Sequence, residues 1–410
     1  MADFLMAAQN GRTIPKEDKI FGISNRAKAM IEEKGSDAVI NATIGTLLDD
    51  KGDLMVLSSV AEIFSNLSKD EYAAYAPIGG TPAFRKAAVR AAFGKYEPKG
   101  AVEAVATPGG TGAIRNTISN YSQPGDAILT GDWFWSPYGT IAAEIGRKLE
   151  TFTLFTEDRV FNIEAFSAKV SELLAKQDYL VIILNTPAHN PTGYALSDED
   201  WRKVVGCLSK LPAEKKVALL IDAAYIDFAG DEEKYRSFLP IVETLPANVL
   251  PIMAYSMSKT FTIYGMRCGA MICMAKTAEI ADEFRRVCEF SSRGSWSNCA
   301  KAGQSVIARI YADEALLTKV TEERRQIRDM LLARGRAFEE EAKKVGLEIV
   351  PFDAGFFVSI PCDNPDEISR KLEKKGIFLV PLAKGLRVSV ASVSEERCRM
   401  LPAKIVAAMK

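Results

Sequence analysis

The sequence of 410 residues contains one histidine, His189, and seven cysteines, none of which forms a Cys-x-x-Cys pair. A Ser-His-Asp triad could be built only around this one histidine. A metal site with several histidine ligands cannot be formed, so no metal site is expected. The odd number and wide scatter of the cysteines argue against a disulfide framework and indicate reduced thiols.

Neither sign of charge is in excess, since the formal net charge is −1. A partner such as nucleic acid or an anionic membrane would require a clustered basic surplus, which the sequence lacks. The apolar runs are too short to span a bilayer, and the N-terminus mixes polar with apolar residues too early for a signal peptide. We therefore expect a soluble, cytoplasmic protein, in which local arginines could still bind a phosphate or a carboxylate.

Apolar residues, by contrast, make up 48% of the chain, which is enough to form a large buried core. Short apolar runs alternate with helical patterns, which is typical of an α/β protein with a largely parallel sheet. A helix is predicted over 197–211, where Ser197 can cap the first turn and Asp200 replaces the usual glutamate. Strands are predicted at 178–184, 217–221, 249–254 and 269–274.

The C-terminal third has a different pattern. Residues 275–346 read as long helices, and the charged run at their end is interpreted as a solvated helix face. Strand-like stretches at 348–360 and 385–391, with a helical interval over 365–375, then predict a smaller α+β unit. No linker or internal repeat separates the parts, so we expect them to pack closely.

Four short segments carry candidate chemistry, and the first is Thr107 to Arg115, TPGGTGAIR, which follows a weak strand and opens a helix. Small residues there would let backbone N–H groups approach an anion at the helix N-terminus. A dinucleotide-binding loop is the alternative, because Gly110 and Gly112 match two glycines of its motif and Asp132 lies near the place of its ribose-binding acid. Arg115, however, occupies the third glycine position, and a plain glycine-rich turn also remains possible.

The second segment, Asn185 to Gly193, is a polar loop bounded by prolines that directly follows an apolar strand. Open α/β sheets place their ligand sites at such strand ends, although a rigid turn would give the same sequence.

The third and fourth segments also follow apolar strands. Asp222 and Tyr225 lie in DAAY, where a buried carboxylate would need a cationic or hydrogen-bonding partner, unless Asp222 simply caps the next helix. Lys259 lies among small residues in SMSKT, where desolvation would lower its pKa and make its amine available for a Schiff base. Arg267, eight residues further on, could hold a phosphate with two parallel hydrogen bonds.

Taken together, GGTGA, Trp135, AHNPTG, DAAY and SMSKTFTIYGMR closely resemble the fold-type I, class I aminotransferases that depend on pyridoxal phosphate. The resemblance is to the aspartate and aromatic amino-acid branch and runs from about Ile20 to Arg387. It implies a mostly parallel seven-stranded sheet between helices and a smaller α+β domain. The implied boundaries are an N-terminal arm with part of the small domain at 1–48, a cofactor-binding domain at 49–310 and a small C-terminal domain at 311–410.

The resemblance also implies roles for the residues around the cofactor. Lys259 would form the Schiff base and shuttle the proton, and Asp222 would pair with the ring nitrogen and keep it protonated. Trp135 would stack on the ring, with Trp133 as the alternative. The remaining implied contacts are Tyr225 and Asn190 to the phenolic oxygen of the ring, and Gly109, Gly110, Thr111, Ser256, Ser258, Arg267 and, from a neighbouring subunit, Tyr75 to the phosphate.

For the substrate, the resemblance assigns the α-carboxylate to Arg387, whose planar guanidinium can bind it at two points, with a backbone contact from Gly45. Arg293 of the partner subunit in a homodimer would bind a side-chain carboxylate. Three further residues would line the pocket, namely Ile20, Phe21 and Phe357.

Two departures from the family pattern affect these expectations. Trp296 and the pair Cys299-Ala300 change the loop after Arg293. Tyr138 stands near a position often held by histidine, which leaves the arrangement of hydrogen bonds behind Asp222 open.

The expected reaction is transfer of an amino group from an L-amino acid, aspartate or aromatic, to a 2-oxo acid, with 2-oxoglutarate as the expected acceptor, by a ping-pong mechanism. A lyase or decarboxylase on the same fold is one alternative, because fold and cofactor do not fix the reaction. Two further alternatives are a non-catalytic regulator that binds the same cofactor and a nicotinamide dehydrogenase.

Overall fold

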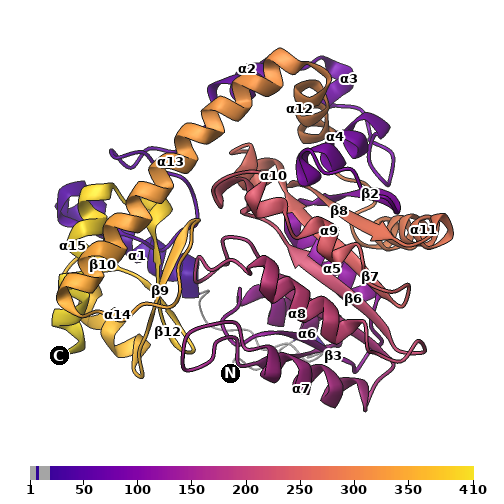
Figure 1. The fold of residues 1–410 in the computed structure, drawn as a ribbon. Helices are drawn as coiled ribbons and strands as arrows, with labels where there is room; N and C mark the ends of the chain where they lie inside the picture. The colour runs from indigo at the N-terminus through magenta and orange to yellow at the C-terminus, as the bar shows by residue number, and fades with distance from the viewer. Residues whose placement is uncertain (1–5, 9–18) are drawn as a thin grey trace.

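The computed structural model describes residues 6–8 and 19–410, so the predicted N-terminal arm falls partly outside the described residues. A seven-stranded sheet lies at the centre of the larger part of the molecule, with helices on both faces (Figure 1). Its strands, in spatial order, are β2 (Ala101–Pro108), β8 (Cys268–Ala275), β7 (Val249–Ser256), β6 (Lys216–Asp222), β5 (Tyr179–Asn185), β3 (Ala127–Gly131) and β4 (Lys148–Phe152).

Only β8 runs against the other strands of this sheet. It pairs antiparallel with both neighbours, β2 and β7, whereas the pairs from β7 through to β4 are all parallel. The mostly parallel sheet is therefore confirmed. The four predicted strands are confirmed as β5, β6, β7 and β8, each within two residues of the expected bounds.

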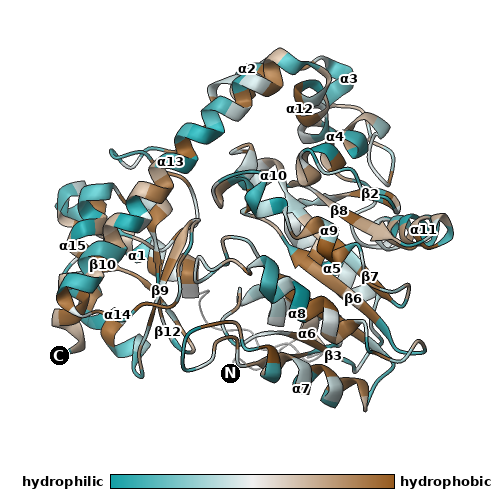
Figure 2. Cartoon of the chain, viewed as in Figure 1, coloured by the Kyte–Doolittle hydropathy of each residue, from teal (hydrophilic) through white to brown (hydrophobic). Residues whose placement is uncertain are grey.

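The central strands are buried on both faces, as their unbroken aliphatic runs predicted (Figure 2). Sequence analysis did not predict two strands of this sheet, β3 and β4. Because β4 lies at the edge of the sheet, it carries the charged residues Lys148, which is exposed, and Glu150, which is half-buried, in place of an apolar run.

One of the helices in this part of the molecule begins at the capping residue that the sequence predicts. The predicted helix at 197–211 is observed as α8, Asp198–Leu208, with Ser197 and Asp200 forming the expected reciprocal cap. The others are α2 (Ser58–Ser65), α3 (Lys69–Tyr72), α4 (Pro82–Phe93), α5 (Gly109–Asn120), α6 (Pro137–Glu144), α7 (Ile163–Leu174), α9 (Leu239–Val242), α10 (Met257–Thr260), α11 (Ala278–Ser295) and α12 (Lys301–Ala312).

Helix α13, Glu314–Val345, is 32 residues long and leads from this part of the molecule to a second α+β part (Figure 1). There, an antiparallel sheet is formed by β9 (Phe357–Pro361), β12 (Gly385–Ser389) and β11 (Val380–Leu382). A short parallel pair joins β1 (Ile40–Asn41) to β10 (Ile377–Phe378). Three further helices cover these strands, namely α1 (Lys19–Lys34), α14 (Pro365–Glu373) and α15 (Glu395–Met409).

The strand expected over 348–360 is shorter than predicted. Only β9 from Phe357 pairs with a neighbouring strand, because Pro351 and the left-handed Gly355 (φ +99°) interrupt the stretch before it. Among the described residues, none of the helices has the length and apolar character needed to cross a membrane.

Candidate active site

The candidate residues gather at one edge of the seven-stranded sheet. Asn185, Asp222 and Ser256 are the last residues of β5, β6 and β7, which are parallel and so end at the same edge. Because β8 is reversed, Arg267, which precedes it, stands at this edge as well. The sheet topology thus brings together segments that are far apart in the sequence.

A cradle for an anion lies where α5 begins, directly after β2. Gly109 has φ +71°, and a Cβ atom on it would come within 2.6 Å of Arg267 Nη2. A Cβ atom on Gly110 would lie 3.4 Å from the Cβ of Ser256. Glycine is required at these two positions because the backbone passes so close to the side chains of Arg267 and Ser256. The backbone N–H groups at the N-terminus of α5, including that of Thr111, therefore lie beside the guanidinium of Arg267.

Arg267 is held in place by its own hydrogen bonds. Its Nη1 donates to Ser258 Oγ at 3.1 Å and to the Tyr264 carbonyl at 2.9 Å. A fixed guanidinium at a helix N-terminus, with two serine hydroxyls nearby, has the donors that a phosphate group requires.

Lys259 lies on α10, the single turn that follows β7, and is partly buried. Burial lowers the pKa of its amine from 10.5 to about 8, an effect that the charge of Asp222 opposes and that of Arg267 reinforces. Its Nζ lies 5.4 Å from the centre of the Tyr225 ring. The amine is thus more easily deprotonated than that of an ordinary surface lysine, as the sequence predicted.

Asp222 is buried, and two groups hydrogen-bond its carboxylate. The Tyr138 hydroxyl donates to Oδ2 at 2.5 Å, and the backbone N–H of Ala224 donates to Oδ1 at 3.3 Å. Burial raises the pKa of Asp222, while the Tyr138 hydrogen bond and the charge of Lys259 act to lower it. Tyr138 therefore supplies the contact that sequence analysis had left open.

The single histidine does not contact this carboxylate directly. His189 Nδ1 lies 2.7 Å from Thr192 Oγ1, and the backbone of Trp133 hydrogen-bonds the ring. Burial lowers the pKa of His189 to about 3, so the ring is neutral at pH 7. We interpret its role as holding the Asn185–Gly193 loop against the Trp133 segment.

Arg387 lies on β12 and reaches the same edge from the second part of the molecule. It is buried, its Nη1 donates to Asn190 Oδ1 at 3.2 Å, and its Nη2 donates to the Thr43 carbonyl at 2.7 Å. Asn190 also hydrogen-bonds Tyr225, whose pKa is raised by burial. The Nε of Arg387 has no hydrogen-bond partner among the described residues, which leaves a donor for a ligand.

The Phe357 ring forms the floor beneath this arginine. The guanidinium carbon of Arg387 lies 4.3 Å from the ring centre. A Cβ atom on Gly45 would come within 2.5 Å of the ring, so this position has room only for glycine.

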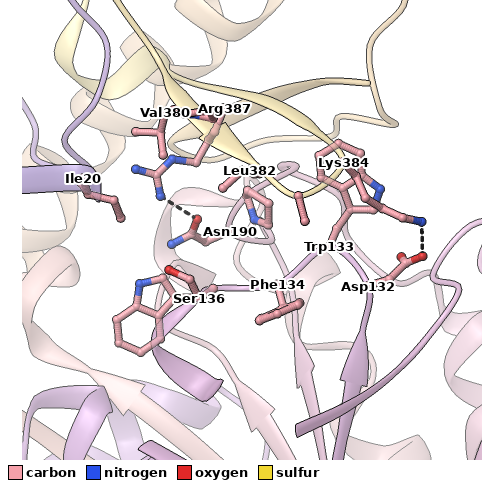
Figure 3. A pocket seen from close by; sticks show the side chains of 14 residues that line it. Ile20, Asp132, Trp133, Phe134, Ser136, Asn190, Val380, Leu382, Lys384 and Arg387 are labelled. Carbon is pink, nitrogen blue, oxygen red and sulfur yellow. Dashed lines mark hydrogen bonds and ion pairs between the residues drawn. The ribbon is translucent and has the colours of Figure 1, made fainter. Parts of the chain in front are cut away.

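A cavity of about 210 Å³ opens beside Arg387 and Asn190 (Figure 3). The β11–β12 hairpin forms one wall, and aromatic residues that follow β3 form another. Trp135 packs edge-on against Tyr138, with ring centres 5.6 Å apart. The described lining residues are Ile20, Asp132, Trp133, Phe134, Trp135, Ser136, Asn190, Pro191, Val380, Pro381, Leu382, Ala383, Lys384 and Arg387.

Three of the predicted residues are exposed at the surface of the chain and do not line this cavity. Phe21 is 65% exposed, whereas its neighbour Ile20 lines the cavity. Tyr75 is 90% exposed, and Arg293 is an exposed residue of α11 that donates to Ser297 Oγ at 2.8 Å.

Two charged residues of the cavity had no predicted role in this site, Asp132 and Lys384, which form an ion pair across it. Asp132 had been noted only as the acid of a dinucleotide loop, and Lys384 lies in an unremarkable hairpin turn. The one available signal was their position, since Asp132 precedes the aromatic segment and Lys384 precedes Arg387 by three residues.

Comparison with known proteins identifies the family. The family model for aminotransferase class I and II matches residues 37–405. The aspartate aminotransferase of Salmonella typhi is 28% identical over 97% of this chain and 99% of its own length. The aromatic-amino-acid aminotransferase of Pseudomonas aeruginosa is also 28% identical, over 86% of this chain and 88% of its own.

Solved structures agree with this assignment. An aminotransferase from Anaerococcus prevotii superposes with a TM-score of 0.96 and 38% identity, covering 99% of this chain and all of that one. An aromatic-amino-acid aminotransferase from Burkholderia pseudomallei, covalently bound to pyridoxal phosphate, has the same fold, with a TM-score of 0.82 at 21% identity over the full length of both chains. The chain belongs to the class I and II aminotransferases and is a pyridoxal-phosphate-dependent enzyme of that family.

Proposed function

We propose that the enzyme moves the amino group of aspartate or of an aromatic L-amino acid to a 2-oxo acid, 2-oxoglutarate in particular, in two half-reactions at one site. The observation that carries this proposal is the convergence of Lys259, Asp222 and Arg387 at one edge of the sheet, with a partly aromatic cavity opening beside Arg387. Both donor classes are proposed because the relatives include enzymes named for each.

The residues present fit pyridoxal phosphate. The α5 N-terminus with Gly109, Gly110 and Thr111 would bind the phosphate, together with Ser256, Ser258 and Arg267, and the two glycines leave the space that a Cβ atom would fill. Tyr225 and Asn190 would hydrogen-bond the phenolic oxygen, and Trp135 would cover one face of the ring. When bound, this cofactor supplies a carbonyl carbon that reacts with amines and a ring that withdraws electrons.

Asp222 would hold a proton on the ring nitrogen. Its carboxylate is buried and keeps its hydrogen bonds from Tyr138 and Ala224, so it can serve as a fixed counter-ion in a site that excludes water.

Lys259 would bind the cofactor and afterwards act as the base at the substrate α-carbon. An amine with a pKa of about 8 takes up and releases a proton near neutral pH, which suits a general base. The same Nζ atom would take the proton from the substrate α-carbon and hold it until it is returned at the other end of the same proton transfer.

Arg387 would bind the α-carboxylate of the substrate through its guanidinium, with the backbone of Gly45 and the Phe357 ring shaping that end of the cavity. Ile20 would contact the substrate side chain from α1.

We also propose a homodimer in which Tyr75 and Arg293 of one subunit complete the site of the other, at the phosphate and at a side-chain carboxylate. Exposed aromatic residues in the same segments support this proposal, because Phe290 on α11 is 82% exposed and Tyr72 on α3 is 54% exposed. Light scattering on the purified protein should give the mass of two chains.

One spectrum tests the reaction. The cofactor-loaded protein should absorb near the visible edge, and adding aspartate or phenylalanine should shift that band while one equivalent of 2-oxo acid forms. Adding 2-oxoglutarate should then restore the band. Release of carbon dioxide or ammonia would indicate a decarboxylase or a lyase, and an unchanged spectrum would indicate a binding protein without this activity.

A further inference from the structure

Among the residues that the structure describes, three charged side chains line the cavity, and they occupy two separate places on its wall. Arg387 lies beside Asn190, whereas Asp132 and Lys384 form their ion pair elsewhere on the wall, with Trp133, Phe134 and Leu382 between the two sites (Figure 3). The cavity therefore has a cation for one carboxylate, an apolar wall, and a second cation that is already neutralised.

Asp132 is the fixed member of the pair. Its backbone N–H donates to the Phe152 carbonyl at 2.9 Å, and its Oδ1 accepts from the Leu154 N–H at 3.1 Å, so the other oxygen, Oδ2, remains for Lys384. The Asp132 side chain is 13% exposed, compared with 45% for Lys384. Lys384 comes from the β11–β12 turn on a long, flexible side chain, so it can change partners while Asp132 stays in place.

The state of this pair decides which substrate side chains the cavity accepts. If Arg387 binds the α-carboxylate, as the proposed function requires, a second carboxylate would meet a lysine whose charge is cancelled and an aspartate that repels it. An uncharged ring needs no counter-ion and would pack against the apolar wall of Trp133, Phe134 and Leu382.

We propose that the Asp132–Lys384 pair is a specificity determinant that raises the preference for uncharged, aromatic side chains relative to dicarboxylic ones, while both classes are still bound. The selection rests on the proposed function and acts within one subunit. It is separate from any contribution of Arg293 from a partner, and the two effects combine in the measured preference.

The test is Asp132→Asn in the cofactor-loaded enzyme. Asparagine keeps the oxygen that accepts from Leu154 but removes the charge, which frees Lys384 to bind a carboxylate. The ratio of kcat/KM for aspartate to that for phenylalanine, from single-turnover half-reactions, should rise about tenfold. In the double variant Asp132→Asn with Lys384→Met, this gain should disappear, because the freed cation is gone.

A matched control removes one negative charge elsewhere. Glu367→Gln breaks the exposed Glu367–Lys371 pair on α14, outside the cavity, and should leave the ratio unchanged. An equal rise in this control would attribute the effect to net charge and overturn the proposal. An unchanged ratio in Asp132→Asn, or a gain that persists in the double variant, would also overturn it.

Binding separates this inference from the proposed function. Calorimetry with succinate and 3-phenylpropanoate, which carry no amino group to transfer, should show the ratio of their affinities shifting toward succinate by a similar factor in Asp132→Asn. If the wild-type enzyme transfers no amino group but this shift occurs, the proposed function fails and the selectivity of the cavity stands. If transamination occurs but neither ratio moves, the inference fails and the function stands.

Discussion

The two halves of the site are built in different ways. The cofactor half consists of strand ends and a helix N-terminus from one continuous sheet, with Gly109, Arg267 and Asp222 fixed by backbone geometry and burial. The substrate half is assembled from side chains on separate elements, with Arg387 on the β11–β12 hairpin facing Asn190 and Lys384 facing Asp132. Changes in the first half should thus affect all substrates alike, whereas changes in the second should alter the preference among them.

The largest effect is expected in the cofactor half, from Lys259→Ala. Turnover should fall by at least about 10⁴-fold for every donor, because the proposed general base and the proposed attachment point of the cofactor are lost together. Lys203→Ala, at an exposed lysine of α8, should leave turnover unchanged. Borohydride reduction of the loaded wild-type enzyme followed by peptide mapping locates the attached lysine, and label on any lysine other than Lys259 would refute the assignment.

Asp222→Asn should reduce kcat by about 10²- to 10³-fold, since a neutral amide cannot hold the proton on the cofactor ring. The loss should be the same for aspartate and phenylalanine, as expected for the cofactor half. Near-UV circular dichroism should confirm that the fold is kept, because asparagine can still accept the Tyr138 hydrogen bond. Full activity in this variant would show that another group protonates the ring.

Arg293→Ala tests the substrate half across the proposed dimer. Breaking a desolvated charge pair on one side costs about 2 to 5 kcal/mol, roughly 30-fold to several thousand-fold in kcat/KM for aspartate and 2-oxoglutarate. Phenylalanine should be much less affected in its half-reaction. Equal losses for both donors, or none for either, would remove Arg293 from the substrate site.

The smallest effect is expected from Tyr138→Phe, which removes one hydrogen bond to the buried Asp222 carboxylate. The free energy of unfolding should fall by about 1 to 3 kcal/mol at neutral pH. Loss of the Tyr138 hydroxyl raises the pKa of Asp222 further in the folded state. Once the Asp222 carboxyl is protonated, it no longer depends on the hydrogen bond that the Tyr138 hydroxyl donates. The destabilisation should therefore shrink as the pH falls through the titration of Asp222, in urea unfolding at several pH values. A loss that is independent of pH would mean that Tyr138 contributes through packing alone.

Sequence reasoning could group the residues of the proposed cofactor half because local patterns show where the strands end. The aliphatic runs that end in Asp222 and Ser256 are visible as strands, and polar residues after parallel strands collect at one edge. The pairing of Asp132 with Lys384 could not be predicted in this way, because the two residues are 252 positions apart and meet only through the placement of a hairpin. Likewise, no periodicity distinguished the cavity-lining Ile20 from the exposed Phe21.

The pairing of β2 with β8 also constrains how the molecule is made. β2, the first strand of the large sheet in the chain, pairs with β8, the last one, so that Ala101 lies opposite Ala275. β2 therefore has no partner strand until the chain has been synthesised past Ala275. Gly109 and Arg267 face each other only after this closure, which joins the two strands of the large sheet with the greatest sequence separation and is expected to form late in folding. Capture of the phosphate group would then stabilise a finished sheet, and the rate at which newly made chains acquire the cofactor would report the rate of sheet closure.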